Sequence, residues 1–242
     1  MFEKIDQKKA LLDAKRPLPK HTLKSLRDKL LLEWTYNTNA IEGNTLTINE
    51  TKVVLEGITV GGKTMREHLE VINHRDAITF VEEIVKNQES LTEWQMKNIH
   101  RLILKGIDDE YAGVYRDQKV LISGAKHTPP DPLLIQEQME QLIDWYKKEA
   151  KQLHPITRGA MLHVNFVGIH PFIDGNGRTS RLLLNLELMK EGFPPIVIKV
   201  ENRLDYYKAL DKAHTEKDYN DFIRLVKVEA EDSIDLYLKT VS

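Results

Sequence analysis

The chain has 242 residues, of which 41% are hydrophobic and 30% are charged, and it contains no cysteine. The lack of cysteine excludes a disulfide scaffold, a thiol nucleophile and a cysteine-ligated zinc or iron–sulfur site. With 35 basic and 37 acidic residues, the formal net charge of −2 argues against a globally basic nucleic-acid-binding surface. No apolar run approaches the ~18 residues of a membrane span, and the charged start lacks the apolar core of a signal peptide, so we expect a soluble cytoplasmic protein.

The first part of the chain is dominated by helical periodicity. Thr22, Asn49 and Thr92 stand where helix N-caps are expected, because their side chains can accept from free backbone N–H groups. We therefore expect an N-terminal segment made of helices, followed along the chain by a further helix. The predicted helices span residues 22–36, 49–55, 65–87 and 92–104.

Residues 111–132 break this pattern, because glycines and prolines surround the β-rich core Val120-Leu121-Ile122. That composition is typical of a short strand or hairpin. Helical patterns then return, and the helix expected over 178–191 is apolar nearly all round, so it should be central and buried. The sequence thus predicts an all-α fold with one small β-hairpin. The later predicted helices span residues 133–152, 155–168, 178–191, 203–214 and 217–240.

One candidate phosphate site is Gly57–Thr64, GITVGGKT, which fits the P-loop pattern G-x-x-x-x-G-K-[ST]. A P-loop needs a buried strand before it and a helix after it. The preceding residues, INETKVVLE, are a poor buried strand, because five of the nine are polar or charged. We therefore interpret the segment as a glycine turn between helices, with a P-loop ATPase as an alternative.

A second candidate is HPFIDGNGRTSR, residues 170–181. Its two glycines allow a tight turn that exposes backbone N–H groups, and the helix that follows points its positive end into the loop. Arg178 and Arg181 share one face of that helix end, where two cations are unfavourable unless an anion is bound. The carboxylate of Asp174 beside phosphates suggests Mg²⁺, and His170 is a candidate proton acceptor.

This string resembles the Fic family motif, H-P-F-x-[D/E]-G-N-G-R-x-x-R, at every defined position. The resemblance covers about residues 20–235 and implies an all-α fold with a small β-hairpin flap. It also implies a protein adenylyltransferase, which transfers AMP from ATP, with Mg²⁺, to a Ser, Thr or Tyr hydroxyl of a protein. The implied parts are an N-terminal helical segment over 1–90, a Fic core over 91–230 and a C-terminal helix end over 231–242.

The resemblance assigns roles within the motif. His170 corresponds to the base that deprotonates the target hydroxyl, and Asp174 to the Mg²⁺ ligand. The remaining positions correspond to the nest around the phosphates, with Arg178 toward the β-phosphate and Arg181 toward the γ-phosphate. The nucleotide-binding residues implied here are Asp174, Gly175, Asn176, Gly177, Arg178, Thr179, Ser180 and Arg181.

Two further regions of the nucleotide site follow from the same resemblance. The segment Ile122–His127 resembles the flap that aligns the target by strand addition. Tyr206 and Tyr207 resemble residues on the nucleoside side, although helix packing explains them equally well, and His214 stands where an Asn is expected near the adenine. The flap residues assigned to the nucleotide site are Ser123, Gly124, Ala125 and Lys126.

A second motif lies upstream, in Thr38-Asn39-Ala40-Ile41-Glu42-Gly43. It resembles the Fic inhibitory motif [S/T]-x-x-x-E-[G/N], in which Thr38, Glu42 and Gly43 are the defined positions. The motif lies before the core in the same chain, and in this position it resembles the inhibitory helix of the class II Fic proteins. The resemblance implies that Glu42 pairs with Arg181 and occupies the position of the γ-phosphate.

The sequence therefore predicts an autoinhibited protein adenylyltransferase that also modifies itself. The alternatives are a hydrolase that removes AMP at the same site, with Glu42 orienting water, and transfer of another phosphate-containing group. Outside this class stand the P-loop ATPase and an interaction module whose basic N-terminal residues bind nucleic acid. The expected partners are ATP and a protein with a target hydroxyl, and a homodimer is a family-level expectation.

Overall fold

The structure is a computed structural model that describes residues 1–241 and is built from α-helices, with no β-strand among those residues. This confirms the predicted all-α class. None of the described helices has the combination of length and apolar character needed to cross a membrane. The helices are α1 (Glu3–Asp13), α2 (Lys20–Ile41), α3 (Ile48–Leu55), α4 (Met65–Lys86), α5 (Glu93–Leu104), α6 (Ile135–Lys148), α7 (Pro155–Ile169), α8 (Asn176–Lys190), α9 (Arg203–Glu216) and α10 (Asn220–Thr240), with single 3₁₀ turns η1 (Pro132–Leu134), η2 (Ala150–Gln152) and η3 (Val200–Asn202).

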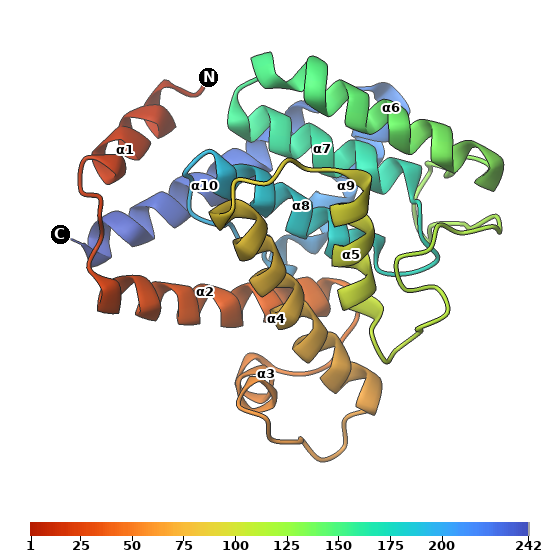
Figure 1. Cartoon of the computed structure of the whole chain (residues 1–242), viewed down its shortest axis with the longest axis horizontal. Helices are drawn as coiled ribbons and strands as arrows, with labels where there is room; N and C mark the ends of the chain where they lie inside the picture. Colours follow the sequence, from red (N-terminus) through yellow and green to blue (C-terminus); the bar gives the residue numbers. More distant parts are fainter. Residues whose placement is uncertain (242) are drawn as a thin grey trace.

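Helix α8 is the central element, and α2, α4, α5 and α7 pack around it (Figure 1). All its residues from 178 to 188 are buried, as the apolar pattern predicts. The pair α7 and α8 is packed closely at Gly159, where an added Cβ would lie 3.0 Å from Leu184 Cδ1. The helix starts at Asn176, two residues before the predicted start, because Gly175 in a left-handed conformation ends the loop there.

Two hydrophobic clusters share α7 and α8. The first joins these helices to α2, α4, α5 and α6, and the second joins them to α1, α9 and α10. Ile5 and Leu12 of α1 are fully buried in the second cluster, and α1 packs against α10 (Figure 1). The first helix of the chain is therefore held on the last one.

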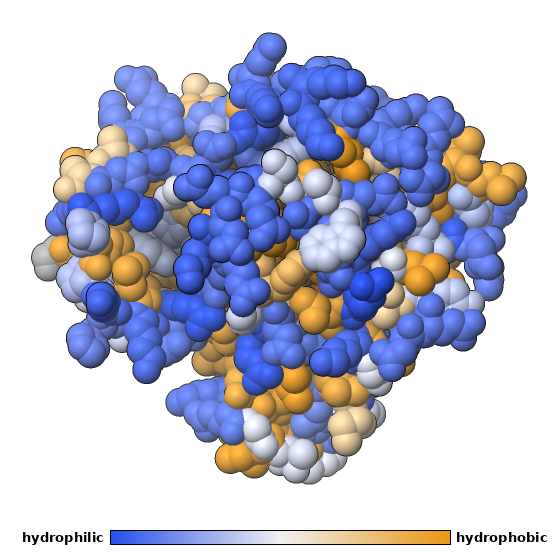
Figure 2. All heavy atoms as spheres, in the orientation of Figure 1, coloured by the Kyte–Doolittle hydropathy of each residue, from blue (hydrophilic) through white to orange (hydrophobic). Residues whose placement is uncertain are grey.

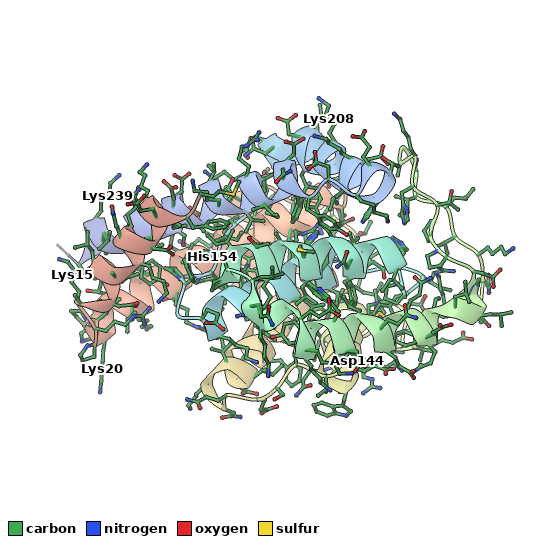
Figure 3. The ribbon with its side chains drawn as sticks, turned by 90° about the horizontal axis from the view of Figure 1, so that it is seen from above. Lys15, Lys20, Asp144, His154, Lys208 and Lys239 are labelled. Atoms are coloured by element: carbon green, nitrogen blue, oxygen red, sulfur yellow. The ribbon has the colours of Figure 1, made fainter. Side chains whose placement is uncertain are left out.

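The outside of the molecule is polar. In Figure 3 the labelled lysines Lys15, Lys20, Lys208 and Lys239 project away from the helices. The face in Figure 2 is mostly hydrophilic, and its apolar atoms form small separate groups, one of them on the lobe that contains α3. Most buried apolar residues lie in the two clusters described above, and a third, smaller cluster of Leu46, Val54 and Val71 lies between α3 and α4.

Helix α2 is longer than predicted, because it covers Lys20–Ile41 rather than 22–36. It begins after Pro19, so the expected N-cap at Thr22 is wrong. The prediction stopped early because the apolar pattern gives way to polar residues such as Thr38. These polar residues are buried through hydrogen bonds, and the helix therefore continues to the end of the inhibitory motif.

The start of α3 also differs from the prediction, since Thr47 and not Asn49 is the N-cap. Thr47 Oγ1 accepts from Glu50 N–H, and the Glu50 carboxylate accepts from Thr47 N–H, which forms a capping box. Helices α4 and α5 begin where the sequence predicts, each with a capping box of its own. Thr92 is confirmed as the N-cap of α5.

The interpretation of GITVGGKT as a glycine turn between helices is confirmed, and the alternative P-loop is excluded because the element before it is helix α3 rather than a strand. The segment is a turn between α3 and α4. Lys63 Nζ donates to the carbonyl and the hydroxyl of Thr45 at 2.7 and 3.0 Å. Its ammonium group therefore ties two loops together.

The predicted β-hairpin over residues 111–132 is not formed. The chain leaves α5 after Leu104, passes through turns as far as Gly113 and returns near η1 without a β ladder (Figure 1). Side chains satisfy its backbone instead: Arg116 donates to three carbonyls, those of His170, Gln118 and Pro130, at 2.8 Å each. Asp211 of α9 accepts from two backbone N–H groups of the returning arm. We refer to Ile122–His127 within this excursion as the flap.

Candidate active site

The motif residues form the loop between α7 and α8. His170 ends α7 in a left-handed conformation, with φ 51° and ψ 58°, and Gly175 begins α8 with φ 75°. Asn176 holds the loop closed, because its side chain accepts from Phe172 N–H at 3.0 Å and donates to Phe172 O at 2.8 Å. A left-handed non-glycine residue is strained, and such strain is typical of functional sites.

His100 of α5 packs against this loop. Its ring stacks on Phe172 at 3.6 Å, and Gly113 N–H donates to its Nδ1 at 2.9 Å. The other ring nitrogen, Nε2, therefore carries the proton and lies 2.8 Å from Asp174 O. Burial lowers the pKa of His100 to about 4, so the ring stays neutral. Sequence reasoning missed His100 and Arg116, because both come from outside the motif.

His170 is a neutral imidazole at the edge of the loop. Burial lowers the pKa of its side chain to about 4, although the Glu42 carboxylate acts in the opposite direction. Its Nδ1 is buried with no hydrogen-bond partner among the described residues. Arg116 fixes the backbone of this residue by donating to its carbonyl. The ring is thus held in the form that can accept a proton.

Arg178 is a buried guanidinium with unused donors. Its side chain is 2% exposed, and its Nη2 lies 3.3 Å from Asp174 Oδ1. Its Nε has no hydrogen-bond partner in the described part of the chain, and its Nη1 makes a 3.5 Å ion-pair contact with Glu70 Oε1 that lacks hydrogen-bond geometry. Buried unsatisfied donors are costly, so this group is prepared for an anion.

Asp174 is the one carboxylate of the loop. Burial alone would raise its pKa, but the charges of Arg178 and Arg66 and a hydrogen bond from Gly175 N–H lower it below the usual value. No cluster of three or more metal-ligating side chains occurs in residues 1–241. Mg²⁺ is commonly bound through one or two carboxylates together with substrate phosphates and water, so Asp174 fits as a single protein ligand.

Arg181 connects the loop helix to the inhibitory motif. Its Nη2 donates to Glu42 Oε1 at 2.6 Å and to Thr38 O at 3.1 Å, and its Nε donates to Thr38 Oγ1 at 2.5 Å. The guanidinium therefore sits at the C-terminal end of α2, where a cation is favourable. The predicted pairing of Glu42 with Arg181 is present in the structure. Gly43 follows with φ 98°, which suits glycine.

The side chains next to Arg181 face inward. Tyr206 is fully buried, and its hydroxyl lies 3.2 Å from Arg181 Nη1 and 3.1 Å from His163 Nε2. Ser180 Oγ also contacts His163 Nε2, at 3.0 Å, and the Thr179 side chain is fully buried. Tyr206 thus contacts Arg181 directly, and His163 links Tyr206 with Ser180. Ser180 Oγ also donates to Gly177 O at 2.9 Å, and Thr179 Oγ1 is buried without a partner among the described residues, so a phosphate contact by either stays a prediction.

Tyr207 is nearer to the surface. Its side chain is 39% exposed, and its hydroxyl donates to Ile41 O at 3.2 Å, one residue before Glu42. His214 is held inside, because its Nε2 lies 2.9 Å from Val164 O and its ring packs on His127 at 4.4 Å. The Nε2 atom of His214 is therefore already in a hydrogen bond and is not free to contact an adenine.

The flap lies against α9 and α7. Asp211 Oδ1 accepts from the N–H groups of Lys126 and His127 at 2.8 and 3.2 Å, and His127 Nε2 lies 2.8 Å from Gly168 O. Ser123, Gly124 and Ala125 form the turn at its tip, with Gly124 at φ 79°. The flap is thus bonded to α7 at Gly168, two residues before His170. Sequence reasoning did not identify Asp211.

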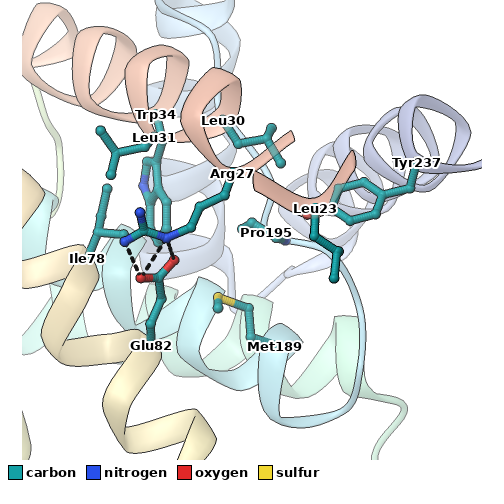
Figure 4. Close-up of a pocket in the computed structure, with 10 residues that line it drawn as sticks. All are labelled: Leu23, Arg27, Leu30, Leu31, Trp34, Ile78, Glu82, Met189, Pro195 and Tyr237. Atoms are coloured by element: carbon teal, nitrogen blue, oxygen red, sulfur yellow. Dashed lines mark hydrogen bonds and ion pairs between the residues drawn. The ribbon is translucent and has the colours of Figure 1, made fainter. Parts of the chain in front are cut away.

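A cavity of about 210 Å³ lies elsewhere, between α2, α4 and α10, and contains none of the motif residues (Figure 4). Arg27 and Glu82 form a bidentate ion pair across it, with distances of 2.6 to 3.0 Å. Trp34 separates it from a second cavity of about 10 Å³ that touches Thr38 and Arg181.

Comparisons with known proteins agree with this geometry. The sequence model of the Fic/DOC family matches residues 90–188. The chain is 38% identical over 245 residues to protein adenylyltransferase Fic of Nematostella vectensis, covering all of this chain and 56% of the relative. It is 39% identical over 209 residues to protein adenylyltransferase fic-1 of Caenorhabditis elegans, covering 85% of this chain and 41% of the relative. The chain spans about half the length of the curated relatives it matches.

Solved structures show the same fold. A Fic domain-containing signaling protein from Bacteroides thetaiotaomicron superposes with a TM-score of 0.90 at 31% identity, over 98% of this chain and 96% of that one. Fic-1 from C. elegans superposes with a TM-score of 0.86 at 34% identity, over 98% of this chain and 72% of that one.

Proposed function

The chain belongs to the Fic/DOC family, and from this premise we propose that it is an autoinhibited protein adenylyltransferase. The substrates are ATP and a Ser, Thr or Tyr hydroxyl of a protein, including a hydroxyl of the chain itself. The observation that carries the proposal is the pair of buried arginines at the start of α8, one with unused donors and one paired with Glu42.

The phosphates of ATP bind at the N-terminus of α8. The first backbone N–H groups of a helix lack partners, and the helix dipole favours an anion there. Arg178 supplies buried donors for one phosphate, and Arg181 supplies a second charge one turn further along. The side chain of Asn176 keeps the loop in the shape that exposes these groups.

His170 acts as the base. Its neutral ring accepts the proton of the target hydroxyl while the oxygen attacks the α-phosphorus in line. The new bond joins that oxygen to phosphorus, the bond to the β-phosphate oxygen breaks, and pyrophosphate leaves. Bound phosphate charge raises the pKa of His170 from about 4 toward the working pH, which suits a general base.

Mg²⁺ held by Asp174 and the phosphates would neutralise the charge of the leaving pyrophosphate. The rest of the catalysis is positional and electrostatic. The flap lies beside α9, and the target segment pairs with its backbone as an added strand. This explains how a segment without a ladder of its own can act as a flap.

Glu42 restrains the reaction. It holds Arg181, the group proposed to bind the γ-phosphate, so ATP must displace the carboxylate or bind with its phosphates misplaced. A misplacement of the α-phosphorus by about 1 Å can cost on the order of 100-fold in rate. The inhibitory role therefore follows from competition for one guanidinium.

A second candidate function uses the same residues. The observation that favours it is that the Glu42 carboxylate acts electrostatically on His170, in the direction that raises the pKa of the ring, and reaches the start of α8 beside Gly177. In that arrangement Glu42 would orient a water molecule and the enzyme would remove AMP from a modified protein. A cytoplasmic location and a homodimer stay predictions from the sequence.

Mass spectrometry of the intact protein after incubation with Mg²⁺ and ATP tests the proposal. A gain of one AMP on a hydroxyl supports transfer, and release of ADP and phosphate without an adduct contradicts it. Incubation with an AMP-modified protein distinguishes the second candidate, because hydrolysis releases free AMP. The same measurements on the Glu42→Gly variant show whether low transfer by the wild type is due to inhibition by Glu42 or to an inactive site.

A further inference from the structure

Helix α4 contributes two charged residues to the phosphate loop. Arg66 Nη2 lies 2.5 Å from Asp174 Oδ2, and Arg66 Nε lies 3.1 Å from Glu70 Oε1. The loop residues complete a ring, since Arg178 contacts both Asp174 and Glu70 at 3.3 and 3.5 Å. Two cations and two anions thus alternate in a closed quartet, which we call the α4 charge ring.

The two oxygens of Asp174 differ in their partners. Oδ1 accepts from Gly175 N–H at 2.6 Å and faces Arg178, so backbone and buried charge hold it in place. Oδ2 faces Arg66, its one partner within residues 1–241. A cation that binds Asp174 from solvent must therefore take the oxygen that Arg66 now holds.

Arg66 is the member of the ring that can leave. Its side chain is 57% exposed, whereas that of Arg178 is 2% exposed. When it leaves Asp174 it keeps its second partner, because Glu70 contacts a different nitrogen of the guanidinium. Glu70 itself stays fixed, since Asn44 Nδ2 also donates to its other oxygen at 2.9 Å.

We propose that Arg66 is a displaceable counter-ion of Asp174, which a divalent cation replaces when nucleotide binds. Arg66 thereby raises the concentration of Mg²⁺ that nucleotide binding needs. This inference rests on the proposed function, in which Asp174 is the metal ligand. It makes α4, which lies outside the motif, a positioning element for the metal.

The size of the effect follows from the kind of contact. Exposed ion pairs contribute little, and the Arg66–Asp174 pair is open to solvent on both sides. Removing it should therefore lower the Mg²⁺ concentration at half-saturation by about two- to five-fold. Replacing Arg66 by an acid should lower it further, because the metal then meets a second carboxylate.

The test is calorimetric titration of a non-hydrolysable ATP analogue at a series of Mg²⁺ concentrations. The full chain carries Glu42→Gly in every sample, so that the inhibitory carboxylate does not block the nucleotide. Arg66→Ala and Arg66→Glu are compared with Arg75→Ala, a matched control on the same helix whose arginine pairs with its neighbour Asp76. Circular dichroism checks that each variant is folded.

We expect the Mg²⁺ midpoint to fall in the two Arg66 variants and to stay unchanged in Arg75→Ala. An unchanged midpoint in folded Arg66→Ala overturns the inference. A weaker affinity for the analogue without Mg²⁺ in that variant also overturns it, because Arg66 would then be a phosphate contact. Absence of analogue binding at every Mg²⁺ concentration, with or without the Arg66 substitutions, contradicts the proposed function itself.

Discussion

Glu42 occupies the space that a side chain at position 177 would fill, because a Cβ added to Gly177 would collide with Glu42 Oε1. The missing side chain lets the carboxylate reach the start of α8. There it meets both the positive end of the helix and the guanidinium of Arg181. The glycine of the phosphate motif and the glutamate of the inhibitory motif therefore fit together as one contact.

The first prediction concerns this contact. Glu42→Gly should raise AMP transfer, including self-modification, by roughly 10- to 100-fold, since a charged hydrogen bond of ~1.5–3 kcal/mol no longer opposes the γ-phosphate. Incorporation of radiolabelled AMP measures the effect. Glu56→Gly, at an exposed end of α3, is the matched control and should leave transfer unchanged.

Adding Arg181→Ala to Glu42→Gly should remove much of this gain, because the freed guanidinium is what binds the γ-phosphate. A Glu42→Gly protein that is folded by circular dichroism and no more active than wild type would contradict autoinhibition. A double variant as active as Glu42→Gly alone would contradict the role of Arg181.

The second prediction concerns the base. His170→Ala should reduce transfer by roughly 100-fold or more, the scale of general-base catalysis. The affinity for ATP should change little, because the phosphates bind to the loop backbone and the arginines. Calorimetry measures the affinity and mass spectrometry the transfer. A comparable loss of both would assign His170 to binding instead.

The third prediction separates the two glycine-rich loops. Asp174→Ala should abolish Mg²⁺-dependent transfer, whereas Lys63→Ala should leave it nearly intact, because the Lys63 ammonium is bonded to Thr45 and paired with Glu50 rather than aimed at a nucleotide. Transfer assays on both variants decide the matter. Loss of activity in Lys63→Ala with retention in Asp174→Ala would mean that the wrong loop was chosen.

The fourth prediction concerns acid stability. Burial lowers the pKa of His100, His170 and His214 to about 4. Below their ordinary value of about 6.5 the unfolded chain binds protons that the folded protein does not, so the free energy of unfolding falls as the pH decreases. Each histidine should contribute on the order of 2 kcal/mol of this loss by about pH 5.

Urea unfolding over a pH series measures this dependence. The loss should begin near the ordinary pKa of histidine and continue until the folded protein also protonates. His21 is exposed at the start of α2, so His21→Gln serves as the control substitution. A free energy of unfolding that stays constant from neutral pH to about pH 5 would disprove the assignment of these groups.

The motif was predictable because its chemistry is contiguous. His170, Asp174 and the two arginines lie within twelve residues, and the loop closes by bonds between Phe172 and Asn176. Such local contacts are determined by sequence spacing. The inhibitory glutamate was predictable for a different reason, namely its resemblance to a second motif, since 139 residues separate it from Arg181.

The supporting residues were not predictable in this way. Arg66, His100 and Asp211 lie on three different helices, and each looks like an ordinary member of its own helical pattern. They reach the site because α4 and α5 pack on α8 and α9 packs on α7. Packing of this kind depends on the whole fold, so a single sequence gives no local signal for it.

Residues 111–132 show how composition can mislead. The β-branched residues Val120 and Ile122 favour a strand, and the chain is indeed not helical there. A hairpin also needs its backbone groups to pair with each other, and Arg116 and Asp211 take several of those groups instead. Absence of helix and pairing into strands are thus separate properties, and the sequence indicated the first.

The position of Trp34 makes the inhibitory helix visible to spectroscopy. Its indole is 4% exposed, lies one turn before Thr38 on α2, and has a cavity on each side, one of which touches Arg181. His74 packs edge-on against it at 5.7 Å. Trp94 is largely exposed and Trp145 is half-buried against the first cluster. In a Trp145→Phe variant the buried component of the intrinsic fluorescence therefore comes from Trp34 and reports on the end of α2, where Glu42 holds Arg181.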